Sequence, residues 1–116
     1  MNERNLQQTA RLALACLDLT SLNDQDSEAD VLRLAARAAA APGTVAALCV
    51  WPRFVPLALA HAPAGVAVAA VANFPEGSDD IERAVRDTQQ IVAAGAQEID
   101  LVLPWRALLA GDTAGP

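Results

Sequence analysis

Two short runs of small apolar residues constrain this chain more than any other feature. Val45–Val50 and Val66–Ala72 contain no charged or strongly polar side chain. Runs of this length and composition are typical of β-strands that are buried on both faces, as the strands of parallel sheets are. Helical periodicity predicts helices around them, at about Glu28–Ala40, at Pro52–His61 and from Ile81 until Gly95 closes the helix. Alternating strands and helices predict an α/β fold with a parallel sheet and right-handed crossovers.

Weaker patterns predict the remaining elements. An amphipathic helix is expected near the N-terminus, with its apolar positions at Leu6, Ala10, Ala13, Leu14 and Leu17. Short strands are expected at Cys16–Thr20 and Gln97–Trp105, followed by a helical turn at Arg106–Ala110 and an irregular tail, Gly111–Pro116. With 116 residues, the chain is long enough for one domain, residues 1–116, but not for two.

The strand predicted at Gln97–Trp105 carries a carboxylate at its centre. Because side chains alternate along a strand, Asp100 falls on the face opposite Ile99 and Leu101. We expect Asp100 to be buried, and a buried carboxylate without partners costs several kcal/mol. The stretch alone leaves two readings open, a functional acid or an acid satisfied by neighbouring donors.

Two architectures fit the alternation, a small doubly wound sheet and part of a (β/α)8 barrel. Each predicted strand has a small or polar residue at its C-terminal end, namely Asp18, Cys49, Asn73 and Asp100. A closed barrel directs such residues to one shared mouth. A doubly wound sheet that binds phosphate would have a glycine-rich turn after its first strand, which this sequence lacks. We therefore expect the barrel.

Charge and composition exclude several functions. The net charge of −6 argues against nucleic-acid binding, which needs clustered cations. All eight basic residues are arginine, and arginine cannot act as an amine nucleophile. A zinc site would need several histidines, and the sequence has only His61, so we expect no metal and no other cofactor.

Cys16 and Cys49 both lie in apolar runs. We expect two buried, reduced thiols, which is typical of a cytoplasmic protein. The N-terminal residues do not resemble a targeting peptide, and no apolar run is long enough for a transmembrane helix, so we expect no membrane partner.

Four blocks of sequence, in order, resemble the 2-deoxyribose-5-phosphate aldolase family. They are Leu17-Asp18-Leu19-Thr20-Ser21-Leu22-Asn23, Leu48-Cys49-Val50-Trp51-Pro52-Arg53-Phe54, Asn73-Phe74-Pro75-Glu76-Gly77 and Glu98-Ile99-Asp100-Leu101-Val102. The resemblance implies the N-terminal half of a (β/α)8 TIM barrel, with about four parallel strands and covering helices. It also implies a class I, Schiff-base aldolase that cleaves 2-deoxy-D-ribose 5-phosphate to glyceraldehyde 3-phosphate and acetaldehyde.

The resemblance implies roles for four residues, and the position of Asn73 at a strand end indicates a role for a fifth. Asp100 resembles the aspartate that relays a proton to the substrate through a water, and the alternative is a structural carboxylate. Asp18 and Thr20 resemble residues near the substrate hydroxyls, although Asp18 also suits a cap. Cys49 resembles a thiol that lines the pocket, with an ordinary buried residue as the alternative. Asn73 is expected to shape the substrate-binding mouth, with a plain turn residue as the alternative.

The chain departs from the family pattern in length and in its lack of lysine. Family members are about twice as long, and their Schiff-base lysine, second lysine and phosphate-binding loops lie on later strands. We therefore expect this chain alone not to catalyse the cleavage of its sugar phosphate substrate. The alternative is a non-catalytic half-barrel that associates with itself, as a homo-oligomer, or with a separate C-terminal half, because open sheet edges favour pairing.

Overall fold

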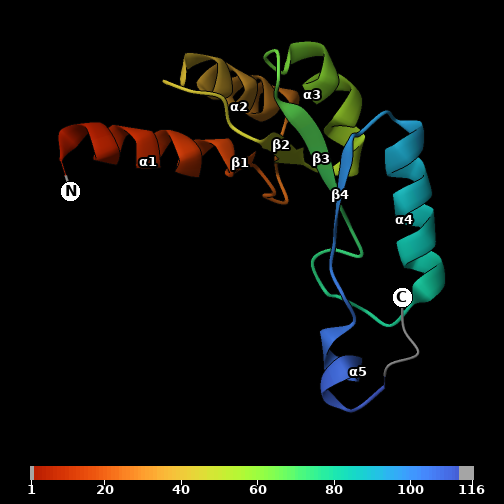
Figure 1. Ribbon diagram of the computed structural model, residues 1–116. Helices are drawn as coiled ribbons and strands as arrows, with labels where there is room; N and C mark the ends of the chain where they lie inside the picture. The colour runs from red at the N-terminus through yellow and green to blue at the C-terminus, as the bar shows by residue number, and fades with distance from the viewer. Residues whose placement is uncertain (1, 113–116) are drawn as a thin grey trace.

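The computed structural model describes residues 2–112 as alternating helices and strands (Figure 1). The elements are α1 (Glu3–Ala15), β1 (Asp18–Thr20), α2 (Glu28–Ala40), β2 (Ala47–Val50), the 3₁₀ turn η1 (Pro52–Phe54), α3 (Val55–His61), β3 (Ala67–Ala72), α4 (Ile81–Ala93), β4 (Glu98–Leu101) and α5 (Trp105–Leu109). Every predicted helix and strand is present, although the last strand is shorter than expected. The predicted tail falls mostly on residues 113–116, which lie outside the described residues. No helix within residues 2–112 is long and apolar enough to cross a bilayer.

The four strands form one parallel sheet in the order β1-β2-β3-β4. Its register places Thr20 opposite Cys49, Cys49 opposite Ala69, and Val71 opposite Asp100. A helix connects each strand to the next, as parallel pairing requires. The predicted α/β fold with parallel strands is therefore confirmed.

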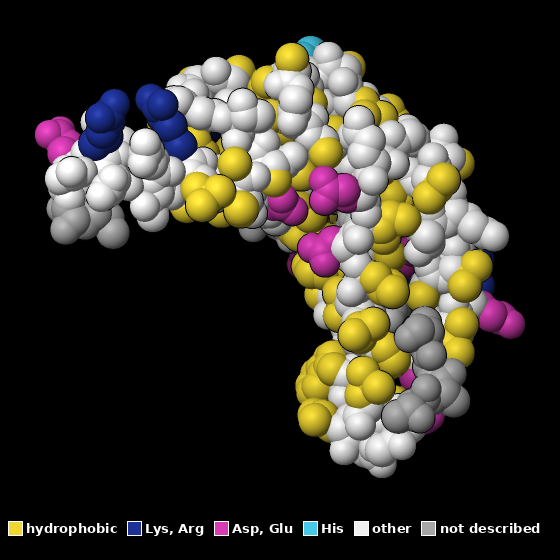
Figure 2. All heavy atoms as spheres, viewed as in Figure 1, with side chains coloured by type: hydrophobic (Ala, Val, Ile, Leu, Met, Phe, Trp, Pro, Cys, Tyr) yellow, Lys and Arg dark blue, Asp and Glu magenta, His cyan; other side chains and the backbone are white. Residues whose placement is uncertain are grey.

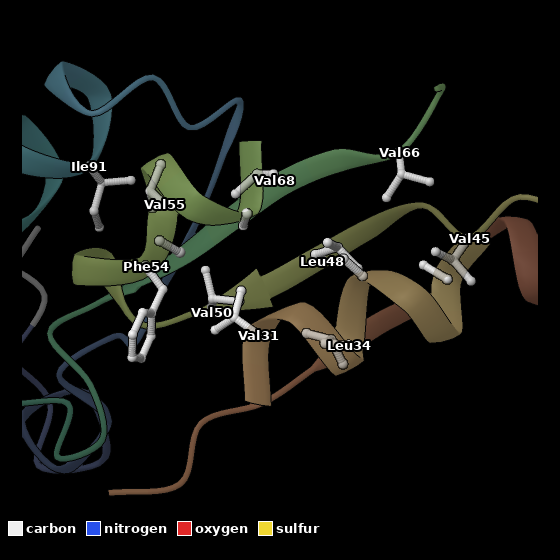
Figure 3. Close-up of a cluster of buried hydrophobic side chains, with 14 of the residues drawn as sticks. Val31, Leu34, Val45, Leu48, Val50, Phe54, Val55, Val66, Val68 and Ile91 are labelled. Carbon is white, nitrogen blue, oxygen red and sulfur yellow. The ribbon is translucent and has the colours of Figure 1, made fainter. Parts of the chain in front are cut away.

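Helices α2, α3 and α4 cover one face of the sheet, and the main hydrophobic core lies between them and the strands (Figure 3). The labelled side chains of this core are Val31, Leu34, Val45, Leu48, Val50, Phe54, Val55, Val66, Val68 and Ile91. Every residue of β2 is buried, because a second and smaller cluster occupies its other face. Burial on both faces explains why apolar residues are continuous along this strand and do not alternate with polar ones.

No helix within residues 2–112 covers the opposite face of the sheet, which we call the inner face. Its buried centre consists of Ala47, Cys49, Ala69 and Val71. The inner face lies on the hollow side of the bend that the molecule makes in Figure 2, and acidic side chains gather near the middle of that side. The functional residues are therefore expected on this face.

The burial predicted for β4 was wrong. Asp100 is exposed, and among the β4 residues only Ile99 is half-buried. β4 is the last strand of the sheet, so a neighbour shields it on one side only. The predicted alternation was correct, because Ile99 packs against the helix-covered core and Asp100 therefore projects from the inner face.

Burial also differs from expectation at α1, at Cys16 and on α4. Helix α1 forms as predicted but buries none of its side chains, because it extends away from the sheet (Figure 1). Cys16, which follows α1, is exposed for the same reason, whereas Cys49 is buried as predicted. On α4, helical spacing predicts that Val85 and Val92 share the buried face with Ala84 and Ile91, but both are exposed because no element within residues 2–112 covers that flank.

Leu48 and Leu12 provide a matched test of this fold. Leu48 is fully buried between β2 and the helices, whereas Leu12 on α1 is 67% exposed. We predict that Leu48→Ala lowers the free energy of unfolding by about 2–5 kcal/mol, since it removes buried methyl groups and leaves a cavity. Leu12→Ala changes it by roughly 0.5 kcal/mol or less. Urea denaturation measures both, and equal effects would contradict this packing.

Candidate active site

Four of the five predicted site residues gather on the inner face of the sheet. The register places Thr20 beside Cys49 and Asp100 beside Val71, and paired residues of neighbouring strands project to the same side. Cys49 and Val71 both belong to the buried centre of the inner face. Asp18 lies two residues before Thr20 and therefore shares its face. Parallel pairing thus brings together residues from β1, β2 and β4.

The pKa of the Cys49 thiol reflects the burial and the negative charges on this face. Burial, together with the nearby carboxylates of Asp100, Asp18 and Glu98, raises its pKa to about 11, while a hydrogen bond with Thr20 acts in the opposite direction. A thiol with this pKa is protonated at neutral pH, so it is a poor nucleophile. Cys49 lies in the buried cluster at the centre of the inner face, with Ala47, Ala69 and Val71.

Asp100 and Asp18 present free carboxylates to solvent. Both side chains are exposed, and neither makes a hydrogen bond or ion pair to residues 2–112. The acidic residues of this part of the chain form no cluster suited to a metal ion. An exposed carboxylate can exchange protons with water or with a bound substrate, which is the chemistry of a general acid or base.

An aromatic wall borders the inner face, and sequence reasoning missed it. The rings of Trp51 and Phe74 meet edge to face, with centroids 5.3 Å apart, and Leu22 packs nearby. The indole N–H of Trp51 donates to the carbonyl of Asn23 at 2.9 Å, which ties the end of β2 to the loop after β1. Phe74 directly follows the predicted site residue Asn73, and Trp51 directly follows the end of β2. These positions could have identified both residues as candidates for the site.

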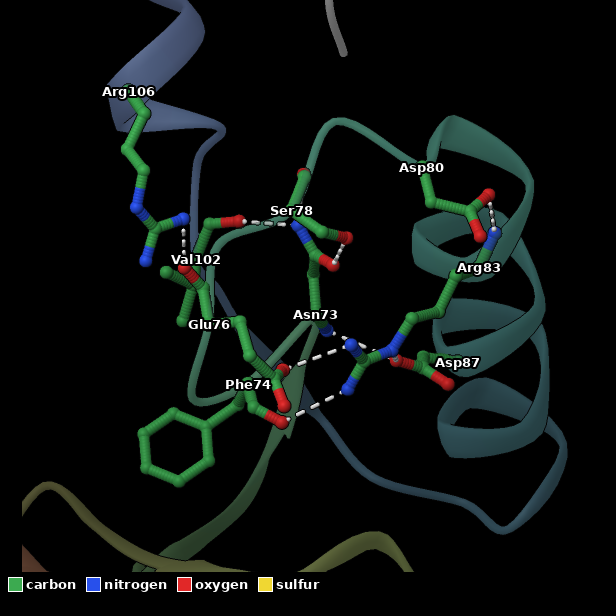
Figure 4. A network of polar contacts seen from close by, with 9 residues as sticks. All are labelled: Asn73, Phe74, Glu76, Ser78, Asp80, Arg83, Asp87, Val102 and Arg106. Atoms are coloured by element: carbon green, nitrogen blue, oxygen red, sulfur yellow. Dashed lines mark hydrogen bonds and ion pairs between the residues drawn. The ribbon is translucent and has the colours of Figure 1, made fainter.

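Asn73, the fifth predicted residue, lies at the end of β3 and is fully buried. Its amide nitrogen donates to the carbonyls of Ser78 and Val102, at 2.8 and 3.1 Å, and its amide oxygen accepts from the Ser78 hydroxyl at 2.8 Å (Figure 4). Both amide hydrogens are thus bonded within the protein. Asn73 adopts a left-handed backbone conformation, with φ of 54°, which asparagine tolerates better than most residues.

Helix α4 holds the loop that follows Asn73. Asp87 accepts from the backbone N–H of Asn73 at 2.9 Å, and Arg83 donates to the Phe74 carbonyl at 3.0 Å and to the Glu76 carboxylate at 2.8 Å (Figure 4). Hydrogen bonds from its own backbone N–H and from Arg83 hold the pKa of Glu76 below its usual value. Asp80 caps α4 by accepting from the Arg83 backbone N–H, as acidic residues at helix starts commonly do.

Comparison with protein families identifies the fold around this site. The model of the DeoC/LacD family of aldolases matches residues 12–115. The chain belongs to this family. The inner face, its carboxylates and the aromatic wall are therefore features of a DeoC/LacD aldolase domain.

Solved structures of aldolases share this arrangement. A candidate deoxyribose-phosphate aldolase from Toxoplasma gondii ME49 is 27% identical, with a TM-score of 0.79, over 93% of this chain and 41% of its own. The tetrameric deoxyribose phosphate aldolase from Aeropyrum pernix is 25% identical, with a TM-score of 0.67, over 91% of this chain and 48% of its own. A Coccidioides immitis protein at 23% identity, whose chain is matched over 51%, shares the fold.

The chain thus spans about half the length of these aldolases or less. Its four parallel strands and covering helices are the N-terminal half of a TIM-barrel aldolase. The barrel predicted from the strand ends and from the sequence resemblance is confirmed to this extent.

The Cys49 thiol tests the geometry of the inner face. We predict that Asp100→Asn lowers the pKa of Cys49, because it removes a negative charge that disfavours the thiolate. The pH dependence of alkylation by iodoacetamide measures this pKa in a Cys16→Ser background, which leaves one thiol. Glu3→Gln, at the far end of α1, is the control and should leave the pKa unchanged. An unaltered pKa in Asp100→Asn would show that the two side chains do not share a face.

Proposed function

We propose that this chain supplies the proton-transfer side of a class I deoxyribose-phosphate aldolase site. The proposed reaction is cleavage of 2-deoxy-D-ribose 5-phosphate to glyceraldehyde 3-phosphate and acetaldehyde, a step of deoxynucleoside catabolism. Family membership and the aldolase neighbours support the reaction class. The observation that carries the proposal is the free carboxylate of Asp100 on the inner face, close enough to the Cys49 thiol to raise its pKa.

Each residue of the inner face has a chemical part in this proposal. In a Schiff-base mechanism, an amine condenses with the substrate aldehyde, and the resulting iminium accepts the electrons of the carbon–carbon bond that breaks. Asp100 relays protons through a water during these steps, while Asp18 and Thr20 bind substrate hydroxyls. Cys49 lines the pocket as a neutral thiol, and Asn73 shapes its mouth.

The amine must come from outside this sequence. The chain has no lysine, and its arginines stay protonated and do not form imines. We therefore propose that a stretch of polypeptide with a lysine completes the sheet beside β4 and β1, whose outer edges have no partner within residues 2–112. Without that stretch, the chain is proposed to be inactive toward this small sugar phosphate.

A second candidate function is association without catalysis. Val85 of α4 and Leu101 of β4 line one groove, and helical spacing places Ile81 and Val92 on the same side of α4 as Val85. All four are exposed, Val92 to 60%, and we call them the apolar stripe. Such a stripe favours burial against another half-barrel or another copy of this chain. A second copy would repeat the carboxylates of the inner face and bring no lysine, so we favour a lysine-bearing half as the partner that closes the barrel.

A chimaera tests the proposed function. Residues 1–112 of this chain would be joined to the part of the Toxoplasma gondii aldolase beyond the region that this chain matches. We predict that the chimaera cleaves deoxyribose 5-phosphate and forms an imine that borohydride traps. Asp100→Asn should lower kcat by about 100- to 10,000-fold, the range typical of lost general acid–base catalysis, while the trapped imine persists. Coupled assay of glyceraldehyde 3-phosphate and mass spectrometry measure the two effects.

Two controls accompany the chimaera. Glu3→Gln, remote from the inner face, should leave kcat unchanged, and a cooperative unfolding transition verifies the fold of each variant. The chain alone, with its α-amino group acetylated and then mixed with substrate and borohydride, should give no adduct because it contains no lysine. An adduct on the chain alone, or an unchanged kcat in Asp100→Asn, would overturn the proposal.

A further inference from the structure

The loop between β3 and α4 is bonded to the end of β4, two residues beyond Asp100. Asn73 reaches across from the end of β3 and donates to the Val102 carbonyl at 3.1 Å (Figure 4). We infer that Asn73, supported by Ser78, is a positioning residue that fixes the place of Asp100 on the inner face. The inference rests on the proposed function, because it concerns the residue to which that proposal gives proton transfer.

Both backbone groups of Val102 are held by the end of β3. Its N–H donates to the Ala72 carbonyl at 3.0 Å, and its carbonyl accepts from the Asn73 amide. β4 is an edge strand with one neighbour, so these bonds limit fraying of its C-terminal end. Only Leu101 separates Val102 from Asp100, and an extended backbone of that length has little freedom to turn. Fixing Val102 therefore fixes the direction in which Asp100 projects.

Asn73 is itself held firmly enough to act in this way. Its side chain is fully buried, and Ser78 both donates to its amide oxygen at 2.8 Å and accepts from its amide nitrogen at 2.8 Å. On the other side, Asp87 of α4 accepts from its backbone N–H. The amide thus has one orientation that satisfies all of these partners.

Close packing at Gly77 strengthens the same connection. A Cβ atom on Gly77 would lie 2.5 Å from the Leu103 carbonyl oxygen and 2.8 Å from a Val102 methyl carbon. Gly77 also has φ of +63°, a conformation that residues with side chains rarely adopt. Arg83 anchors this loop to α4 through the Phe74 carbonyl. The loop is therefore fixed to α4 on one side and to the segment after β4 on the other.

The test is a double-mutant cycle that uses the pKa of Cys49 to report where Asp100 lies. The chain carries Cys16→Ser, and iodoacetamide alkylation as a function of pH measures the pKa of Cys49. Asp100→Asn is introduced into chains with and without Asn73→Ala. We expect the fall in pKa caused by Asp100→Asn to shrink by half or more when Asn73→Ala is present. The same fall in both backgrounds would overturn the inference.

Two further variants separate positioning from general loss of stability. Leu34→Ala destabilises the core at α2 without touching β4, so the effect of Asp100→Asn should remain complete there. If Leu34→Ala diminishes the pKa change caused by Asp100→Asn as much as Asn73→Ala does, the inference is overturned. Ser78→Ala removes only the hydroxyl that supports Asn73, and it should diminish the effect less than Asn73→Ala. If Asn73→Ala does not fold, Ser78→Ala still tests the inference. An undiminished fall in the Cys49 pKa on Asp100→Asn in the Ser78→Ala chain would count against it.

Amide hydrogen exchange gives a second measurement. The Val102 amide should exchange faster in Asn73→Ala and Ser78→Ala, whereas the Val50 amide in β2 should not. Equal protection of Val102 in all chains would contradict the inference. These measurements need no catalysis, so their failure would leave the aldolase proposal standing, and failure of the chimaera would leave the positioning of Asp100 intact.

Discussion

Parallel backbone pairing between neighbouring strands is the interaction on which the candidate site depends. The register between β1 and β2 brings Thr20 to Cys49, and the register between β3 and β4 brings Asp100 to Val71. A slip of one residue would turn each side chain to the helix-covered face. Burial of Leu48 and its neighbours on that face opposes such a slip, because it would expose the core. Core packing thus determines which side chains reach the inner face.

The inner face then combines chemistry that is only part of an aldolase site. It has a buried neutral thiol, free carboxylates and an aromatic wall, but no lysine is present anywhere in the sequence. The same open edges that leave Asp100 exposed also leave the α4 flank uncovered. Exposure of the acid and exposure of the apolar stripe therefore have one cause, and the partner that we propose would cover both.

Local patterns in the sequence predicted much of the fold and of the site. The continuous apolar runs indicated strands buried on both faces, and alternation placed Asp100 opposite Ile99. Burial of Cys16 and of Asp100 was predicted wrongly, since exposure depends on which elements have neighbours in space. The bond between Asn73 and Val102 joins residues far apart in the chain, so no local pattern could reveal it.

Disulfide formation across β3 and β4 tests the central claim most directly. In a chain with Cys16→Ser and Cys49→Ser, Val71→Cys would be combined with either Asp100→Cys or Ile99→Cys and oxidised in glutathione buffer. Paired residues on adjacent strands lie about 5 Å apart, within reach of a disulfide. The account predicts that the Asp100→Cys chain forms the intramolecular disulfide, seen by mass spectrometry, and that the Ile99→Cys chain does not. The reverse result would contradict the parallel register and the place of Asp100 on the inner face.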